Sequence, residues 1–242
     1  MNTIKGSQHG TDRKTAVIVG VLYIVGTAAG VLSLIFAGSI LKDPDYLLKV
    51  SANESRIITG ALCVLIMGLA LAMVPVLMFP IFRKYNEALA LGAVVFRGAL
   101  ETAIYIAAAI FWLLLMTVGQ EYVKAGVPVS SHFQTLGALL LKSSDQTGSI
   151  LDIVFSLGAL MIYCLFYQSN LIPRWLSVWG LAGAALYLVS GLLNLFNLDF
   201  GILEAPLALQ EMFLAVWLIV KGFDLHPVID KVETVQAAMN PV

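Results

Sequence analysis

The sequence predicts an all-α, polytopic membrane protein, a bundle of six transmembrane helices. Of the 242 residues, 60% are hydrophobic and 12% are charged, about half the charged share of a soluble domain. Six apolar runs are each long enough to cross a hydrocarbon core about 30 Å thick as a helix. The runs are continuous and lack the alternating pattern of an outer-membrane β-barrel. A chain with so little polar surface needs lipid around it.

The six predicted spans form one transmembrane domain over residues 15–223. The first run is longer than the apolar core of a signal peptide, so we interpret it as a retained span. A cytoplasmic segment over residues 1–14 precedes the domain, and a cytoplasmic tail over residues 224–242 follows it. The predicted spans cover residues 15–41, 57–82, 89–118, 148–167, 175–197 and 205–223.

The distribution of Lys and Arg between the loops predicts the orientation. Cytoplasmic loops carry an excess of these residues. On the side of the two termini lie Lys5, Arg13, Lys14, Arg83, Lys84, Arg174, Lys221 and Lys231. On the other side lie Lys42, Lys49, Arg56, Lys124 and Lys142. This asymmetry predicts that both termini are cytoplasmic. We expect the helical bundle to lie in the inner cell membrane.

The longest predicted loop covers residues 119–147, on the outer side. A short helix over residues 133–141 is too short to span, so it is expected to lie in the interface, where it covers the helix ends or acts as a lid. Small residues at Gly26 and Gly30, and again at Gly180 and Ala184, allow close helix contact. We expect them to pack inside the bundle.

The third apolar run contains two charged residues, Arg97 and Glu101. Residues four apart share one face of a helix, so these two can form an ion pair. A charged residue inside a span is costly and by default indicates a functional site. In an alternative interpretation, the membrane-embedded part of this helix begins only near Gly98, and the Arg97 side chain extends to the membrane interface. Glu101 lies inside the membrane in both interpretations.

Two further carboxylates lie in later spans, at Asp152 and Glu211. We hypothesise that they share an outward-opening polar cavity with Glu101, that Arg97 partly neutralises the three, and that a protonated carboxyl or a bound cation balances the remaining negative charge. Neighbouring side chains available for hydrogen bonding are Tyr105, Asn194 and Gln210. In the alternative, Asp152 and Glu211 are first-turn residues that remain in headgroup water, where the helix dipole favours carboxylates.

Several functional classes lack support in the sequence. A net charge of −1 without a basic stripe argues against nucleic-acid binding. The histidines, His9, His132 and His226, lie outside the spans and have no metal-ligand spacing. Neither a nucleophile elbow nor a Gly-rich phosphate loop is present. We therefore expect no metal, no cofactor and no catalytic residue, although an enzyme that works with carboxylates alone stays open.

Three stretches, taken in order, resemble a known family of bacterial membrane proteins, the domain of unknown function 4386. They are Phe96-Arg97 with Glu101, then Asn170-Leu-Ile-Pro-Arg-Trp-Leu-Ser-Val-Trp-Gly180, then Glu211 followed by Ala215-Val-Trp-Leu-Ile-Val-Lys-Gly222. The resemblance implies a bacterial integral membrane protein and no particular activity.

The function expected from these residues is binding or transport of a small solute, lipid or cation through a polar pocket inside the membrane. One alternative is a structural or regulatory subunit that docks another membrane protein through its small-residue faces and has no closed internal cavity. A second is a carboxylate-dependent enzyme that acts on lipid. The sequence indicates the lipid bilayer as a partner and does not indicate the oligomeric state.

Overall fold

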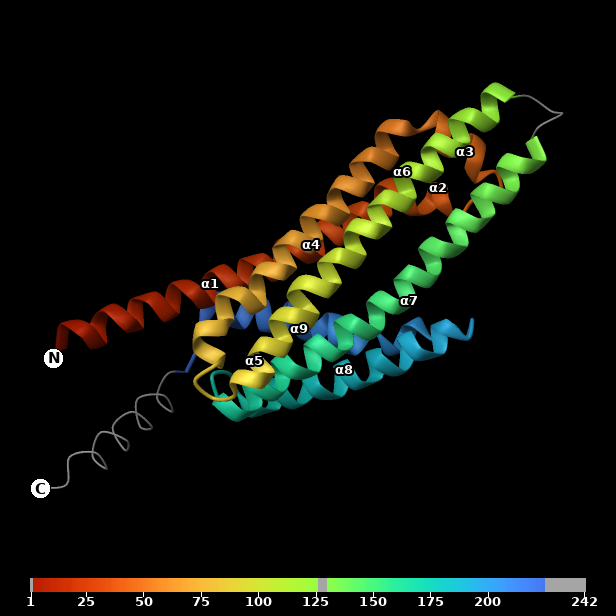
Figure 1. The fold of residues 1–242 in the computed structure, drawn as a ribbon. Coiled ribbons are helices and arrows are strands. Elements are labelled where there is room, and N and C mark those ends of the chain that lie inside the picture. The colour runs from red at the N-terminus through yellow and green to blue at the C-terminus, as the bar shows by residue number, and fades with distance from the viewer. Residues whose placement is uncertain (1, 126–129, 225–242) are drawn as a thin grey trace, which may run out of the picture.

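The computed structural model describes residues 2–125 and 130–224, with side chains from residue 12 and from residue 131 onward. Within these ranges the chain is helical and has no strand, which confirms the all-α prediction (Figure 1). The elements are α1 (Asn2–Ser33), η1 (Leu34–Gly38), α2 (Ser39–Leu41), α3 (Tyr46–Ala52), α4 (Glu54–Phe82), α5 (Glu87–Ala93), η2 (Val94–Leu100), α6 (Glu101–Ala125), α7 (Ser130–Ser169), α8 (Arg174–Leu195), η4 (Gly201–Leu203) and α9 (Ala205–Val220).

Six helical stretches of the described chain are long and apolar enough to cross a membrane, which confirms the predicted number of spans. The protein is therefore a multi-pass membrane protein. The first span begins and the last span ends at the same end of the bundle (Figure 1). Which membrane holds the protein, and on which side the termini lie, stay predictions. The stretches are Asp12–Leu41, Glu54–Phe82, Glu87–Ala125, Ser131–Ser169, Arg174–Leu195 and Gly201–Val220.

The long loop predicted over residues 119–147 is wrong. Helix α6 continues to Ala125, and α7 begins at Ser130 and runs unbroken into the fourth span. The polar residues that lower the hydropathy before the span are part of this helix, and some of their hydroxyl groups donate to carbonyl oxygens one turn earlier. Thr147, for example, donates to the carbonyl oxygen of Ser143 at 2.7 Å.

The predicted N-terminal segment and tail lie only partly within the described residues. Helix α1 already begins at Asn2, so the backbone does not change at the predicted boundary after residue 14. Residues 225–242 of the predicted tail lie outside the described ranges.

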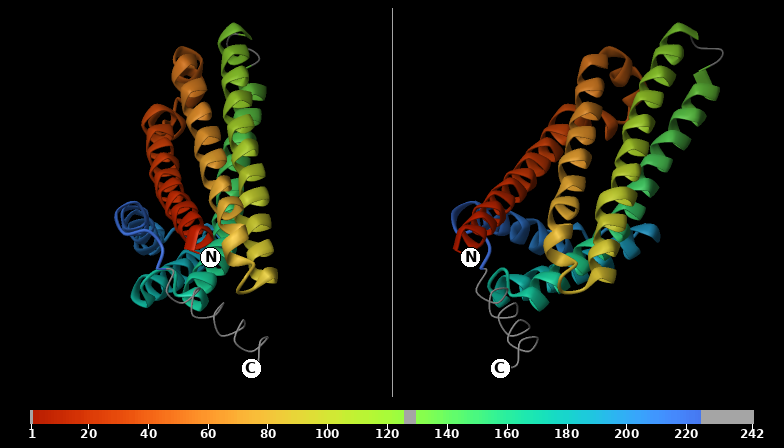
Figure 2. Two further views of the ribbon diagram at one scale, coloured as in Figure 1. Left: turned by 90° about the vertical axis from the view of Figure 1, so that its left-hand side faces the viewer. Right: turned by 60° about the vertical axis from the view of Figure 1, so that its left-hand side comes forward.

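The six spans form a closed ring. In order around the ring, α1 packs on α4, α4 on α6, α6 on α7, α7 on α8, α8 on α9, and α9 on α1. Helices α8 and α9 are tilted against the long helices and stop short of the end where α2 and α3 lie (Figure 2). The ring is therefore closed by six helices near the chain termini, while α1, α4, α6 and α7 continue toward the other end.

Apolar side chains cover both the inside and the outside of the ring. On α4, Val64 and Leu71 are buried, while Leu62, Ile66 and Leu69 are at least half exposed on the opposite face. A helix that is apolar on all sides is typical of a membrane span. We infer that the exposed face contacts lipid, so polar groups inside the ring lack an aqueous alternative.

Glycines set the distance between neighbouring helices. A Cβ atom added at Gly26 would lie 2.7 Å from the side chain of Leu71, and one at Gly30 would lie 2.7 Å from that of Met67. Both neighbours belong to α4, so this small-residue face packs within the bundle, as predicted. A Cβ atom at Gly180 of α8 would overlap the ring of Tyr163 on α7.

The first prediction compares two glycines of α7. A Cβ atom at Gly158 would lie 2.9 Å from the backbone nitrogen of Arg97, whereas one at Gly148 would meet no atom within 4 Å. Because backbone cannot move aside as a flexible side chain does, Gly158→Ala should lower the stability by about 1–3 kcal/mol. Thermal unfolding in detergent measures this effect. Gly148→Ala is the control, and equal stability losses would contradict the packing argument.

Candidate functional site

The centre of the ring is occupied by the charged side chain of Arg97. This residue lies in η2, a π-helical segment that interrupts the third span. A π-helical turn changes the direction of the side chains around it and often occurs at functional sites. Arg97 is 1% exposed, and Gly158 allows α7 to pack directly on its backbone. Arg97 is therefore enclosed by the bundle rather than extended toward solvent, and its depth in the membrane stays a prediction.

Two carboxylates hold the guanidinium group. Arg97 Nη2 donates to Glu211 Oε1 at 2.8 Å, and Nη1 lies 3.4 Å from Glu101 Oε2. The predicted pairing of Arg97 with Glu101 within one helix is thus confirmed. Glu211 is 9% exposed and comes from α9, on the far side of the ring. It does not remain in headgroup water, so that alternative is wrong for Glu211.

Aromatic side chains enclose this cluster of Arg97, Glu101 and Glu211, which we call the charged cluster. The ring centre of Phe155 lies 4.1 Å from Cζ of Arg97, a cation–π contact. The hydroxyl groups of Tyr23 and Tyr105 lie beside Arg97 and Glu101. In a dry interior such neighbours replace the water that charged groups would otherwise bind.

Gln210, the residue before Glu211, joins three helices. Its side-chain oxygen accepts a hydrogen bond from the hydroxyl group of Tyr163 at 2.5 Å, and its amide nitrogen donates to the carbonyl oxygen of Leu176 at 3.0 Å. All these groups are buried. Gln210 therefore fixes α9 against α7 and α8 next to the charged cluster, which is a positioning role.

Asp152 belongs to a different polar group, between α7 and α8. Its carboxylate accepts a hydrogen bond from Asn194 at 3.5 Å, and the Tyr187 hydroxyl group lies next to it. Nearby, Ser190 donates to Glu204 at 2.9 Å. Because α7 begins at Ser130, Asp152 lies in the middle of a long helix, so its interpretation as a first-turn residue is wrong.

A mostly apolar cavity of about 510 Å³ lies beside the charged cluster. We call it the inner cavity. Of the seven predicted site residues only Tyr105 lines it, and Tyr187, the neighbour of Asp152, lines it too. The structure thus places the carboxylates behind two tyrosines. Helices α1, α4, α6, α7 and α8 all contribute to the wall, including Thr27, Val64, Tyr105, Trp112, Gly148 and Tyr187.

A second cavity of about 610 Å³, the outer cavity, lies at the end of the bundle away from the termini. Polar residues at its rim include Lys42, Asp43 and Asp145. Asp43 forms an ion pair with Lys49, and this hydrogen bond lowers the pKa of the Asp43 carboxyl. Asp43 therefore stays ionised and is already paired.

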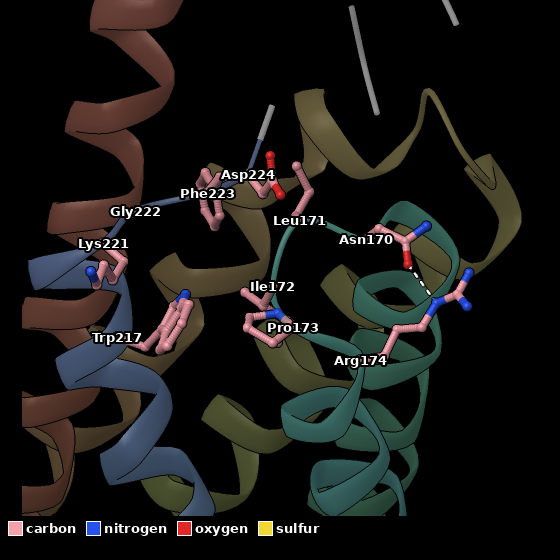
Figure 3. A pocket seen from close by; sticks show the side chains of 10 residues that line it. All are labelled: Asn170, Leu171, Ile172, Pro173, Arg174, Trp217, Lys221, Gly222, Phe223 and Asp224. Atoms are coloured by element: carbon pink, nitrogen blue, oxygen red, sulfur yellow. Dashed lines mark hydrogen bonds between the residues drawn. The ribbon is translucent and has the colours of Figure 1, made fainter. Parts of the chain in front are cut away.

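A third hollow lies at the opposite end, between the turn that connects α7 with α8 and the end of α9 (Figure 3). Arg174 Nε donates to Asn170 Oδ1 at 2.9 Å across this turn. The backbone nitrogen of Asp224 donates to the carbonyl oxygen of Leu171 at 2.8 Å. These contacts support a structural role for the turn and for Arg174.

The aromatic side chains around the charged cluster and Gln210, chiefly Tyr23, Phe155 and Tyr163, were not predicted from the sequence. Their positions in the sequence were a usable signal. Membrane proteins concentrate tyrosine at the two membrane interfaces, so a tyrosine within an apolar run is unusual. Tyr23 and Tyr163 lie well inside apolar runs and are 1% exposed. A tyrosine in that position needs a polar partner inside the bundle.

The comparisons with known proteins find one family. A family model described as a domain of unknown function, DUF4386, matches residues 18–222. No curated protein and no solved structure matches the chain. The matched region includes all three residues of the charged cluster.

A second prediction concerns Arg97 itself. Arg97→Met should lower the free energy of unfolding by about 3–5 kcal/mol, because it leaves two buried carboxylates without a counter-charge. Thermal or denaturant unfolding in detergent measures the loss. The triple variant with Glu101→Gln and Glu211→Gln removes those charges and should recover much of the stability. If the triple variant is no more stable than Arg97→Met, the loss does not come from unpaired charge.

A third prediction ranks the two carboxylates. Glu211 lies closer to the guanidinium group than Glu101 does, so Glu211→Gln should cost more stability than Glu101→Gln. Because both residues share Arg97, the double variant should depart from additivity by about 0.5–3 kcal/mol. The same unfolding assay, applied to the two single variants and the double variant, gives this value. Additive effects would show that the carboxylates act separately.

Proposed function

We propose that this chain, which belongs to the DUF4386 family, binds a lipid-like ligand inside the membrane. The observation that carries the proposal is the inner cavity, a mostly apolar space of about 510 Å³ within the ring of spans. Its volume lies within the range of about 300–1,000 Å³ that is typical of ligand pockets. Such pockets are largely apolar with a few polar groups, and the inner cavity is lined mostly by apolar side chains with Tyr105 and Tyr187 among its lining residues.

The cavity exists because the helices differ in length. The third and fourth spans are 39 residues long, whereas the fifth and sixth are 22 and 20. The longer helices therefore continue beyond the part of the ring that α8 and α9 complete. Val31 of α1 and Leu34 of η1 line the cavity and are 53% and 63% exposed. We propose that a ligand enters from the lipid past these two residues.

The charged cluster would respond to the ligand through Tyr105, which lines the cavity and whose hydroxyl group lies beside Glu101. Two carboxylates face one guanidinium group there, so a proton or a cation is needed to balance the charge. A ligand that displaces Tyr105 would alter this balance. Coupling of ligand binding to proton uptake is therefore part of the proposal.

The inner cavity is open on one side rather than closed. A structural subunit that docks another membrane protein, which was expected to lack a closed internal cavity, stays the alternative to this proposal. The space beside Gly148, where an added Cβ atom would meet no atom within 4 Å, favours a ligand.

The proposed function is tested with a variant whose larger side chain fills the inner cavity. A Cβ atom added at Gly148 would meet no atom within 4 Å, and the rest of a leucine side chain would extend into the cavity, so Gly148→Leu should fold and lose the ligand. Trp112 lines the cavity, so brominated stearic acid bound there should quench tryptophan fluorescence. In detergent we expect saturable quenching in the wild type and at least roughly a tenfold weaker response in the variant. The measurement is a fluorescence titration.

The matched control is Ile150→Phe, which adds bulk on the same helix but on the lipid-facing side, where Ile150 is 49% exposed. It should bind the brominated acid as the wild type does. If Gly148→Leu keeps its thermal stability and its affinity, the inner cavity is not the binding site and the proposed function is wrong.

A further inference from the structure

The inner and outer cavities are neighbours along the same groove. Leu34, Trp112 and Ser144 line both of them. The groove therefore runs from the rim at Lys42, at the end of the bundle away from the termini, to Tyr105 beside the charged cluster. Its inner part is mostly apolar and its outer rim is charged. This polarity matches an amphiphile that lies with its head group at the rim.

The rim carries two unlike charges that are not paired with each other. Lys42 and Asp145 both line the outer cavity and lie close enough to interact electrostatically. Among the described residues neither forms an ion pair within 4.0 Å. Both side chains are exposed. Asp43 does not compete for Lys42, because Lys49 already pairs with it.

Charge complementarity selects the head group. The charged residues that line the outer cavity are Lys42, Asp43 and Asp145, and Lys49, which does not line it, balances the charge of Asp43. A purely anionic head group would bring a phosphate to Lys42 and repulsion at Asp145. A head group with a phosphate and a free ammonium satisfies both side chains, since ionised donors and acceptors form the strongest hydrogen bonds. A trimethylated ammonium has no N–H group for the carboxylate.

We propose that the groove binds a zwitterionic phospholipid with a primary amine, its phosphate at Lys42, its ammonium at Asp145, and an acyl chain extending past Trp112 into the inner cavity. The proposal rests on the proposed function and names its ligand class. The charged cluster then lies near the end of the acyl chain. The head group lies at the opposite end of the groove.

The experiment titrates the purified full chain in detergent with four brominated lipids and follows tryptophan quenching. The lipids are phosphatidylethanolamine, phosphatidylcholine, phosphatidylglycerol and diacylglycerol. We expect the ethanolamine lipid to bind roughly tenfold more tightly than the other three. Lys42→Ala and Asp145→Asn should each remove this preference without changing diacylglycerol binding. Lys124→Ala is the control, because Lys124 is exposed, pairs with Glu121 and lines neither cavity.

Each outcome decides between the two proposals. Equal binding of all four lipids, with Lys42→Ala unaffected, overturns the head-group site and leaves the proposed function standing. A preference for phosphatidylglycerol, or displacement of the ethanolamine lipid by millimolar inorganic phosphate, also overturns it, because an anion site would then be present. If no lipid quenches saturably and Gly148→Leu behaves as the wild type, both proposals are wrong.

Discussion

The arrangement of the bundle depends on the burial of one guanidinium group in a protein surrounded by lipid. Arg97 cannot be hydrated where it lies, so it needs counter-charges from the protein. One comes from Glu101 on its own helix, and the other from Glu211, 114 residues further along the chain. This second contact fixes the last span against the third. Because lipid tails are as apolar as the side chains between helices, such polar contacts and close packing decide which helices are neighbours.

Glycine provides the close packing that accompanies the polar contacts. Gly158 lets α7 contact the backbone of Arg97, and Gly20 lets α1 approach the carbonyl oxygen of Ala215 on α9. Gly148 lies on α7 as well, yet no neighbour fills the space beside it. The same helix thus closes the ring at one level and leaves it hollow three turns away. The hollow is therefore a local feature of a well-packed bundle rather than a sign of loose packing throughout.

The number of spans and the Arg97–Glu101 pair could be predicted because both depend on residues close in the sequence. The hypothesis that Arg97 also neutralises Glu211 rested on charge balance, because the contact between these two residues depends on how the ring of helices closes. The start of α7 was predicted as a loop because polar residues before the fourth span lower the hydropathy there. In the structure these residues are helical, and Thr147, for example, donates a hydrogen bond to its own helix. Asp152 was expected to share a cavity with Glu101, but its carboxylate accepts a hydrogen bond from Asn194 of α8 instead.

The charged cluster does not line the inner cavity, and this arrangement affects which ligand the protein can bind. A small cation that reached Glu101 or Glu211 would have to compete with a guanidinium group 2.8–3.4 Å away, enclosed by aromatic rings. An apolar chain in the inner cavity meets no such cost, since the wall of the cavity is mostly apolar. The energetics of desolvation therefore favour an amphiphile over a free ion as the ligand, with the charged cluster acting behind the wall of the cavity rather than as part of it.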